Sequence, residues 1–333
     1  MKILQNQSLL AWNTFHIDVQ ADIFAEYDNI NELCTLLQRY NSLPMLHIGR
    51  GSNLLFTNNF NGIILHSNIC FYHLNTQTEE EVLLEVGAGV VFDDFIRYAV
   101  EHDWGGAENL SYIPGEVGAS AVQNIGAYGV EVKDIIHRVF TINRQTLEPR
   151  IFTNQECQYA YRDSIFKNEM KNQYIVTSVE FKLTKQPRLS LDYGNLRAAL
   201  ADIAKPDIAD VRRTVTAIRQ QKLPEVAELG SAGSFFKNPV IDKQHFDELR
   251  QLYPTIPHYP APNGVKIPAA WLIEQCGWKG KTLGGAQVYD KQPLVIVNKN
   301  NATPKDIVTL ADNISRSIKE KFSISIYPEV NYI

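Results

Sequence analysis

A stretch rich in small residues, positions 111 to 129, constrains the fold of this chain more than any other. It contains Gly115, Gly118, Gly126 and Gly129 with alanines between them. Glycine loses the most conformational freedom on folding, so the stretch is poorly suited to the interior of a helix or strand. Its backbone N–H groups could instead approach a large anion such as a pyrophosphate, in a turn or at a helix start. A plain packing loop between two elements explains the composition equally well.

A second glycine-containing turn follows a short apolar segment at positions 46 to 48. The turn, Gly49-Arg50-Gly51-Ser52-Asn53, leads back into apolar residues, which predicts a strand, a turn and a strand. Two loops of this kind fit a dinucleotide, with its two phosphates and long reach, better than a mononucleotide.

A third glycine segment resembles the dinucleotide-binding fingerprint of Rossmann folds but lacks one part of it. Gly87 and Gly89 follow a predicted strand and precede a predicted helix, but the position of the third glycine is occupied by Phe92. We therefore interpret this segment as the start of an ordinary packing helix.

Composition narrows the class of protein. A length of 333 residues predicts about two domains, and 44% apolar with 21% charged residues is typical of a globular protein with a sizeable core. The net charge of -5 argues against a broad nucleic-acid-binding surface, and the apolar runs are too short to span a membrane. The N-terminus has no secretory h-region. Four scattered cysteines, Cys34, Cys70, Cys157 and Cys276, predict free thiols in a cytosolic protein.

Apolar periodicity predicts helices and strands in alternation, with a domain boundary near position 225. Helices are expected at residues 29–40, 91–100, 208–221, 242–252, 269–276 and 304–321, and strands at 46–48, 62–66, 81–86, 139–142, 174–183, 294–297 and 324–333.

Several common chemistries find no support in the sequence. The histidines are dispersed and no paired-cysteine spacing appears, so we expect no metal site. Gly280-Lys281-Thr282 resembles the end of a phosphate-binding P-loop, but Gln275 stands where its first glycine is required. The segment 230–234 does not have the G-x-S-x-G pattern of a serine hydrolase.

Three polar residues stand out, each with a plain alternative. Ser234 follows Gly233 and precedes two phenylalanines, where a serine is commonly a turn or cap residue. Arg162 could bind a carboxylate through its planar fork or pair with the adjacent Asp163. Glu329 lies near the C-terminus, where a carboxylate is commonly on the solvated face of a strand.

Taken together, these segments resemble the UDP-N-acetylenolpyruvoylglucosamine reductase (MurB) family. The resemblance runs from Asn13 to Glu329, with the motifs in the family's order. The matching segments are Asn13-Thr14-Phe15, residues 49–54, Ile113-Pro114-Gly115, residues 123–129, 161–164, 222–224 and 233–239, and Pro328-Glu329-Val330.

The resemblance implies an α+β fold. It predicts an FAD-binding domain of the vanillyl-alcohol-oxidase/PCMH type, made of two α+β subdomains at residues 1–70 and 71–225. A small α/β substrate-binding domain, residues 226–333, would follow, with its last strand returning to the active site. The family further implies a cytoplasmic enzyme of peptidoglycan precursor synthesis, and hence of cell-wall biogenesis, cell shape and division. We expect a monomer that acts on a small molecule, with no nucleic-acid or membrane partner.

The family's chemistry gives the three polar residues roles. NADPH would reduce non-covalently bound FAD, which then passes hydride to the enolpyruvyl double bond of a UDP-N-acetylglucosamine derivative. Arg162 and Glu329 resemble the pair that supports the negative charge developing on the carboxylate. Ser234 resembles the acid that protonates the adjacent carbon.

The family's binding residues transfer position by position. The residues expected to contact FAD are Gly49, Arg50, Gly51, Ser52, Asn53, Leu54, Pro114, Gly115, Gly118, Ala119, Ser120, Asn124, Gly126, Tyr128 and Arg219. The residues expected to contact substrate are Tyr193, Lys222, Asn238, Tyr259 and Lys279. Tyr259 lies in a proline-rich loop that resembles the long-loop, type I members, in which a tyrosine folds over the UDP.

Two departures from the family pattern and two rival functions stay open. Many members have arginine two residues after the catalytic glutamate, where this chain has Asn331. Glu116 places a carboxylate in the phosphate loop, which is unfavourable unless it points outward. A flavin oxidase on the same fold and a non-catalytic nucleotide-sugar-binding protein are the alternatives.

Overall fold

The structure, a computed structural model, describes residues 1–333 and divides them into two compact units. Unit 1 contains residues 1–7, 20–50 and 60–219, and unit 2 contains residues 8–19, 51–59 and 220–333. Each unit is therefore assembled from segments that are far apart in the sequence. The three-part division at positions 70 and 225 stays a prediction.

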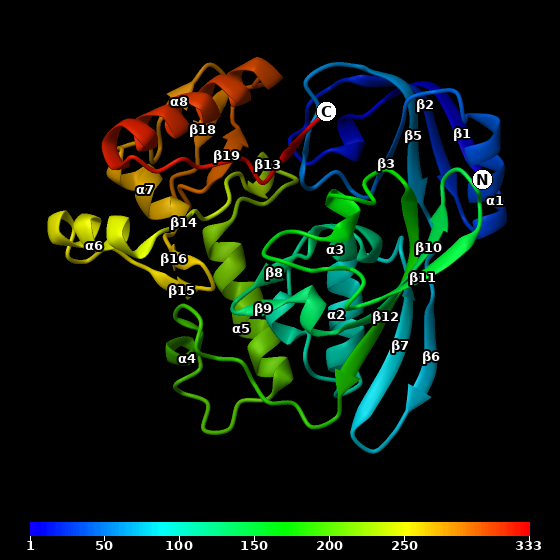
Figure 1. Cartoon of the computed structure of the whole chain (residues 1–333), viewed down its shortest axis with the longest axis horizontal. Helices are drawn as coiled ribbons and strands as arrows, with labels where there is room; N and C mark the ends of the chain where they lie inside the picture. Colours follow the sequence, from blue (N-terminus) through cyan, green and yellow to red (C-terminus); the bar gives the residue numbers. More distant parts are fainter. The chain divides into compact units, whose positions relative to one another are not determined.

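The first sheet of unit 1 has the strand order β1-β2-β5-β3, in which β2 and β3 each pair in parallel with β5 (Figure 1). A parallel pair needs a crossover, and α1 supplies it between β2 and β3. The side chain of Asn29 begins this helix by accepting a hydrogen bond from the N–H of Glu32. These elements are β1 (Lys2–Ser8), β2 (Gln20–Tyr27), α1 (Ile30–Arg39), β3 (Met45–Ile48) and β5 (Phe60–Ser67).

The second sheet of unit 1 is antiparallel, in the order β11-β10-β12-β7-β6. Its central strand β12 is buried along nearly its whole length, whereas the edge strand β6 is exposed throughout. Helix α2 packs on this sheet, with the rings of Phe95 and Phe181 stacked at 4.2 Å between centroids. The strands are β6 (Tyr72–Gln77), β7 (Glu81–Gly87), β10 (Ile136–Asn143), β11 (Pro149–Thr153) and β12 (Tyr174–Thr184).

Helices cover the second sheet, and short elements connect them. Leu196 and Leu200, around α4, pack with Val211, Val215 and Ile218 of α5 in a separate small apolar cluster. The helices are α2 (Phe92–Glu101), α3 (Val117–Gln123), α4 (Leu196–Ala199) and α5 (Ile208–Lys222); the short pieces are β8 (Gly126–Ala127), β9 (Val130–Glu131) and the 3-10 helices η2 (Glu108–Leu110), η3 (Val132–Asp134) and η4 (Ile165–Lys167).

Unit 2 is built on an antiparallel sheet, β13-β19-β18-β17, on which α8 packs. Thr303 and Asp306 form a capping box at the start of α8, with Pro304 in its first turn. The small sheets β14-β16-β15 and β20-β4 complete the unit. Its elements are η1 (Leu10–Trp12), β4 (Leu54–Leu55), β13 (Gly230–Ser234), β14 (Val240–Ile241), α6 (Lys243–Leu252), β15 (Tyr259–Ala261), β16 (Gly264–Lys266), α7 (Ala269–Gln275), β17 (Thr282–Leu283), β18 (Ala286–Val288), β19 (Val295–Asn298), α8 (Pro304–Phe322) and β20 (Asn331–Tyr332).

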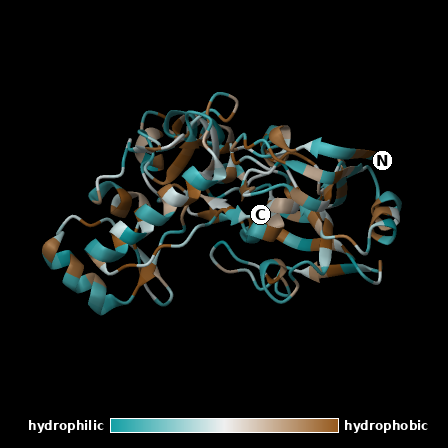
Figure 2. Cartoon of the chain, turned by 90° about the horizontal axis from the view of Figure 1, so that it is seen from above, coloured by the Kyte–Doolittle hydropathy of each residue, from teal (hydrophilic) through white to brown (hydrophobic).

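All the predicted helices are present, and so are the predicted strands except the last. The helices carry apolar and polar residues in alternating bands in Figure 2, as expected for amphipathic helices that cover a core. The predicted strand at 324–333 is confirmed only in part: Asn331–Tyr332 forms a ladder with β4, and Pro328 forms an isolated bridge with Phe236. The alternation that suggested it arises from Ile324 and Ile326, which are buried by packing, and Pro328 has no N–H to donate.

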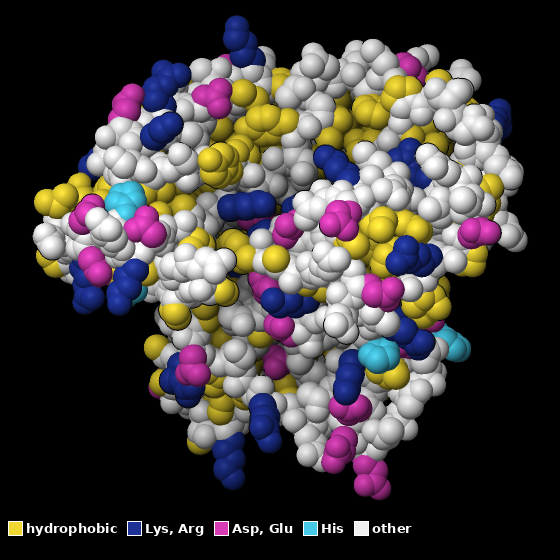
Figure 3. All heavy atoms as spheres, viewed as in Figure 1, with side chains coloured by type: hydrophobic (Ala, Val, Ile, Leu, Met, Phe, Trp, Pro, Cys, Tyr) yellow, Lys and Arg dark blue, Asp and Glu magenta, His cyan; other side chains and the backbone are white.

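The surface carries charges of both signs. Lysine and arginine lie among aspartate and glutamate on the face shown in Figure 3, without a large field of one sign. None of the helices combines the length and the apolar character that crossing a membrane requires.

Candidate active site

The small-residue stretch at 111–129 folds as a short helix between two turns. Helix α3 runs from Val117 to Gln123 and ends at Asn124, whose φ of 46° is left-handed. The helix is possible despite its composition because small residues allow close packing on the loop after β7. A Cβ built on Gly118 would lie 2.9 Å from the Cβ of Ala88. The stretch is thus partly a packing element as well as a loop.

Several N–H groups around the start of α3 are available to an anion. Those of Val117 and Gly118 donate to the carbonyls of Val90 and Ala88. The N–H groups of Gly115, Glu116 and Ala119 donate to no acceptor of the chain. Since unpaired buried N–H groups are unfavourable without a partner, this cluster fits the phosphates of a dinucleotide.

The second glycine loop, residues 49–53, also has backbone N–H groups without an acceptor, both in its unit 1 part and in its unit 2 part. The N–H groups of Arg50, in unit 1, and of Gly51, in unit 2, also donate to no acceptor of the chain. Gly51 has a φ of 65°, and a Cβ there would lie 2.1 Å from the carbonyl oxygen of Trp12. Only glycine is therefore compatible with this turn. The expected strand, turn and strand are confirmed by β3 and β4.

Glu116 does not point outward, although an outward orientation was expected for a carboxylate in a phosphate-binding loop. It is 4% exposed, and its Oε1 lies 2.9 Å from Nε2 of His66 and 3.8 Å from Nε of Arg50. The other ring nitrogen of His66 lies 3.3 Å from Glu26. A Cβ built on Gly49 would lie 3.0 Å from Oε2 of Glu116. The carboxylate is thus held within unit 1, and it links the two glycine loops there.

Two residues expected to contact FAD use their side chains to shape the loop. The buried amide of Asn124 donates to the Ala160 carbonyl at 2.7 Å and to Glu131 at 3.2 Å, and its oxygen accepts from the N–H of Lys133. The Ser120 hydroxyl donates to the Val117 carbonyl at 2.7 Å. Asn124 therefore has no side-chain donor left for a cofactor, and both residues act as supports of the loop.

Arg162 is joined to the glycine loop, not to Asp163. Its Nη2 donates to the Gly126 carbonyl at 2.6 Å, and a Cβ on Gly126 would lie 2.9 Å from Nη1. Asp163 instead accepts hydrogen bonds from Ser164 and Asn168, so the alternative of a local ion pair is wrong. Arg162 has a φ of 56°, an unfavourable conformation for arginine that is typical of functional positions.

Arg219 and Tyr193 also lie by the glycine loop of unit 1. Arg219 Nε donates to the Tyr112 carbonyl at 3.0 Å, and burial lowers the pKa of its guanidinium. Burial raises the pKa of Tyr128, which packs against the apolar cluster of α5. A Cβ on Gly129 would lie 3.2 Å from the Cβ of Tyr193. The backbone around Tyr128 and Gly129 is therefore enclosed by residues expected to bind cofactor and substrate.

Unit 2 brings Ser234 and Glu329 to adjacent backbone segments. Ser234 is the exposed last residue of β13, where it pairs with Val295 of β19. The Glu329 N–H donates to the Phe235 carbonyl at 2.8 Å. Ser234 therefore lies at the end of a strand, and the C-terminal segment runs alongside the residues that follow it. A plain solvated strand face does not describe Glu329, which is half-buried.

The same segment is tied to the second glycine loop within unit 2. Asn53 Nδ2 donates to the Glu329 carbonyl at 3.2 Å, and the Asn331 N–H donates to the Asn53 carbonyl at 3.0 Å. Leu54 pairs with Asn331 in the β4–β20 ladder. Asn331 thus anchors the C-terminal strand. Ser52 lies in the same turn and is half-buried.

The remaining residues expected to bind substrate in unit 2 have varied surroundings. Lys222 is exposed at the end of α5, and Tyr259 lies in β15 with Lys266 Nζ 6.0 Å from its ring centroid. The Asn238 side chain accepts from the N–H of Ala269 at the start of α7. Lys279 forms an exposed ion pair with Glu274 at 2.9 Å, which gives it a purely structural alternative.

No sequence pattern identified two residues, His66 and Asp93, that form hydrogen bonds to the glycine-rich stretch at 111–129. His66 lies in a strand with no distinguishing pattern, and Asp93 is one of two acidic residues at the start of α2. Asp93 accepts from Tyr112 N–H and makes a bidentate pair with Arg212 at 2.7 and 2.9 Å. Burial alone would raise the pKa of Asp93, but these hydrogen bonds hold it below its ordinary value. The only available signal was an acidic residue in the first turn of a helix.

The fold and the comparisons with known proteins define a class of protein. Residues 21–145 match the family described as FAD binding domain, and residues 224–333 match the UDP-N-acetylenolpyruvoylglucosamine reductase C-terminal domain. The fold is shared with 6-hydroxy-D-nicotine oxidase from Arthrobacter nicotinovorans, with a TM-score of 0.57 at 13% identity over 97% of this chain and 86% of the oxidase. The chain is thus an FAD-binding protein of the PCMH-type fold with an additional C-terminal domain.

Relatives with closely similar sequences specify the family. The chain is 50% identical over 332 residues to UDP-N-acetylenolpyruvoylglucosamine reductase from Bacteroides fragilis, covering 99% of each, and 44% identical over 337 residues to that of Porphyromonas gingivalis, covering 100% of each. The solved structure of the Thermus caldophilus reductase (MurB) has a TM-score of 0.69 at 22% identity, over 99% of this chain and 98% of the other. The chain belongs to the UDP-N-acetylenolpyruvoylglucosamine reductase family.

Proposed function

We propose that the protein reduces UDP-N-acetylenolpyruvoylglucosamine to UDP-N-acetylmuramate in peptidoglycan precursor synthesis, with NADPH as the reductant and non-covalently bound FAD. The enzyme is an FAD-dependent oxidoreductase by its family. The observation that carries the proposal is the group of unpartnered N–H donors at Gly115, Glu116 and Ala119, which suits the cofactor's phosphates. Bound FAD supplies the hydride for the reduction.

The residues of the chain provide placement and electrostatic support. We assign Arg162 and Glu329 to the carboxylate of the enolpyruvyl group, where negative charge develops during the reaction. A guanidinium there stabilises that charge, and Glu329 acts by a hydrogen bond or in its protonated form. Arg162 suits this task because its backbone and its bond to Gly126 fix its position in unit 1.

Ser234 is assigned as the proton donor to the carbon next to the carboxylate. A serine hydroxyl is a weak acid, so it can serve only a strongly basic carbon and only when it is aimed at that carbon. Its place at the end of a paired strand gives the side chain a defined backbone, and its exposed hydroxyl is accessible to substrate.

Substrate binding completes the proposal. Lys222 offers a cation for the diphosphate, and Tyr193, Asn238 and Tyr259 offer neutral polar or aromatic groups for the sugar and the uridine. Lys279 is a further candidate. A nucleotide-sugar substrate and an NADPH reductant fit a monomeric enzyme of the cytoplasm, with no nucleic-acid or membrane partner.

Purified protein provides the test. The preparation should be yellow, and it should turn over NADPH continuously only when the enolpyruvyl substrate is present, with one product molecule formed per NADPH consumed. A flavin oxidase would instead form peroxide rapidly without that substrate, and a nucleotide-sugar-binding protein would be colourless. Either of these two results would contradict the proposal.

A further inference from the structure

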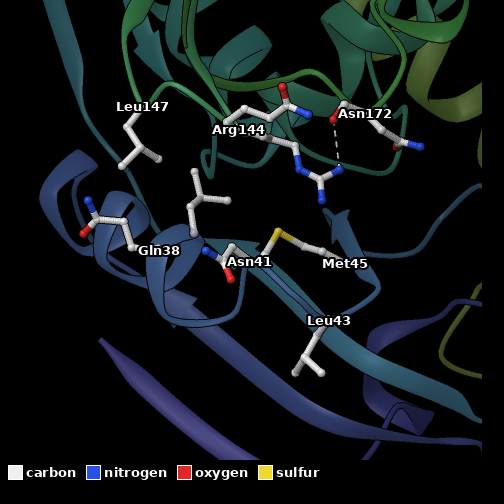
Figure 4. Close-up of a pocket in the computed structure, with 9 residues that line it drawn as sticks. Gln38, Asn41, Leu43, Met45, Arg144, Leu147 and Asn172 are labelled. Carbon is white, nitrogen blue, oxygen red and sulfur yellow. Dashed lines mark hydrogen bonds between the residues drawn. The ribbon is translucent and has the colours of Figure 1, made fainter.

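Unit 1 contains a cavity whose lining residues have no part in the proposed function. It has a volume of about 490 Å³, within the range of about 300–1,000 Å³ that is typical of small-molecule sites. Four segments form it: α1 with the turn that follows, the start of β3, the β10–β11 turn, and the residue Asn172 (Figure 4). The lining residues are Leu37, Gln38, Asn41, Leu43, Met45, Arg144, Gln145, Leu147 and Asn172.

The charged group in this cavity is Arg144, and it has no acidic partner. Its Nη1 donates to the Asn172 carbonyl at 3.0 Å, the bond drawn in Figure 4, and this is its side chain's one hydrogen bond. Arg144 forms no ion pair, and none of the lining residues is acidic. A guanidinium has five N–H donors, so most of them remain available to a ligand.

Because Arg144 is half-buried, its guanidinium should interact more strongly with an anion than a fully exposed arginine would. Burial lowers the pKa of this guanidinium, because the charge is removed from part of its water. A partly desolvated charge without a counter-charge interacts strongly with any anion that reaches it, and a carboxylate matches the guanidinium fork with two parallel hydrogen bonds.

The backbone holds Arg144 in place, so that a ligand would meet a formed site. The Arg144 N–H donates to the Gln173 carbonyl at 2.9 Å. The Asn143 side chain accepts from the N–H groups of Gln145 and Thr146 at 2.8 and 3.0 Å, and the Leu147 N–H donates to the Asn143 carbonyl at 3.0 Å. Binding would therefore require little ordering of this turn.

The remainder of the lining selects the rest of the ligand. Leu37, Met45 and Leu147 offer apolar surface beside the guanidinium, and Figure 4 shows Arg144 and Met45 extending toward each other. The amide side chains of Gln38 and Asn41 add neutral hydrogen-bonding groups. Inorganic phosphate would leave the apolar surface in contact with water, whereas a short branched aliphatic chain would cover it.

We propose that this cavity is a binding site for small aliphatic carboxylates, with the carboxylate on Arg144 and the aliphatic body against Met45 and Leu147. None of the lining residues is assigned to the flavin or the nucleotide sugar, and the inference does not depend on that function.

Calorimetric titration of the flavin-loaded protein with isovalerate at low salt tests the proposal. We expect saturable binding of isovalerate, at least about tenfold weaker binding of its neutral analogue isovaleramide, and no comparable binding of inorganic phosphate. The Arg144→Met variant keeps the aliphatic stem and should weaken isovalerate binding about tenfold or more, the effect expected for a charge-assisted hydrogen bond.

The matched control is Arg150→Met, which removes a partly exposed arginine from the neighbouring strand β11 and should leave isovalerate binding unchanged. Circular dichroism of both variants verifies the fold. Equal binding of isovalerate and isovaleramide, unchanged binding by Arg144→Met, or the absence of saturable binding to the wild-type protein would overturn the proposal. Phosphate binding equal to that of isovalerate would do the same, since it would show that the apolar lining plays no part.

Discussion

The residues proposed for the reaction differ in kind between unit 1 and unit 2. In unit 1 the glycine loop proposed to bind the cofactor offers backbone N–H groups, at Gly115, Glu116 and Ala119, while nearby side chains such as Asn124 hold the loop's shape. In unit 2 the proposed chemistry depends on single side chains, Ser234 and Glu329. A backbone site depends on the packing around it, whereas a side-chain site depends on one functional group. Substitutions in unit 1 should therefore act by disturbing packing, whereas substitutions in unit 2 should act by removing a functional group.

A large effect on steady-state turnover is expected from Glu329→Gln in unit 2. The amide keeps the shape of the side chain but cannot act as a carboxyl, so turnover should fall by about 10²-fold or more, as for the loss of one transition-state stabiliser. Steady-state NADPH oxidation measures this, with flavin content as the check on the fold. Glu320→Gln, an exposed change on α8, is the matched control and should leave turnover unaltered. Equal rates for the two variants would remove Glu329 from the mechanism.

The next effect concerns His47 in β3, the strand of unit 1 that leads into the second glycine loop. Burial lowers the pKa of His47 to about 3, with further lowering from His66 and Arg144, and its Nε2 lies 2.7 Å from the Tyr27 hydroxyl. Since the unfolded chain binds this proton near pH 6.5 and the folded chain does not, stability should fall as the pH drops from about 6.5 toward about 3. Within that window the free energy of unfolding should fall by up to about 1.4 kcal/mol for each pH unit.

Urea unfolding of the wild type and of His47→Gln at pH 6, 5 and 4 measures the contribution of this histidine. The wild type should lose stability more steeply than the variant with falling pH, because glutamine does not titrate. Parallel pH profiles would show that His47 is protonated in the folded protein.

A smaller effect is expected from Gly118→Ala in α3. Alanine favours a helix by about 1 kcal/mol over glycine, but its Cβ would lie 2.9 Å from the Cβ of Ala88, and overpacking costs about 1–3 kcal/mol. We expect a modest loss of stability together with weaker FAD binding, because α3 must shift. Flavin fluorescence during titration of the apoprotein measures the affinity.

The double variant Gly118→Ala with Ala88→Gly is the control for that clash. It removes the opposing Cβ and should recover most of the FAD affinity. If the single variant already binds FAD normally, close packing of α3 does not govern the cofactor loop.

The smallest effect is expected from Lys279→Ala on stability. The ion pair with Glu274 is exposed at both ends, and such pairs contribute about 0–1 kcal/mol. A stability change near zero with a raised KM for the nucleotide sugar would assign Lys279 to the substrate. An unchanged KM would leave it as a surface residue, as the structure alone suggests.

Local sequence patterns predicted the helices and turns of this molecule well, but they did not predict its tertiary contacts. Apolar spacing identified the helices, and the glycine segments identified two turns whose N–H groups lack acceptors, because those features depend on neighbours in sequence. The assembly of each unit from distant segments has no local signal. The same holds for the pairing of Glu116 with His66, fifty residues away, and for the complete occupation of the Asn124 amide. The strand predicted at the C-terminus is shorter than expected because Ile324 and Ile326 are buried without belonging to the β20 ladder.

The central claim is that unit 1 seats the flavin through its backbone while Ser234 of unit 2 supplies the proton to the substrate. Stopped-flow absorbance of the flavin separates the two half-reactions in Ser234→Ala, with Ser325→Ala as an exposed control from the C-terminal segment. The account predicts that NADPH reduces the flavin of Ser234→Ala at the wild-type rate, while oxidation of the reduced protein by the enolpyruvyl substrate slows by about 10²–10⁴-fold. Oxidation at the wild-type rate would contradict it.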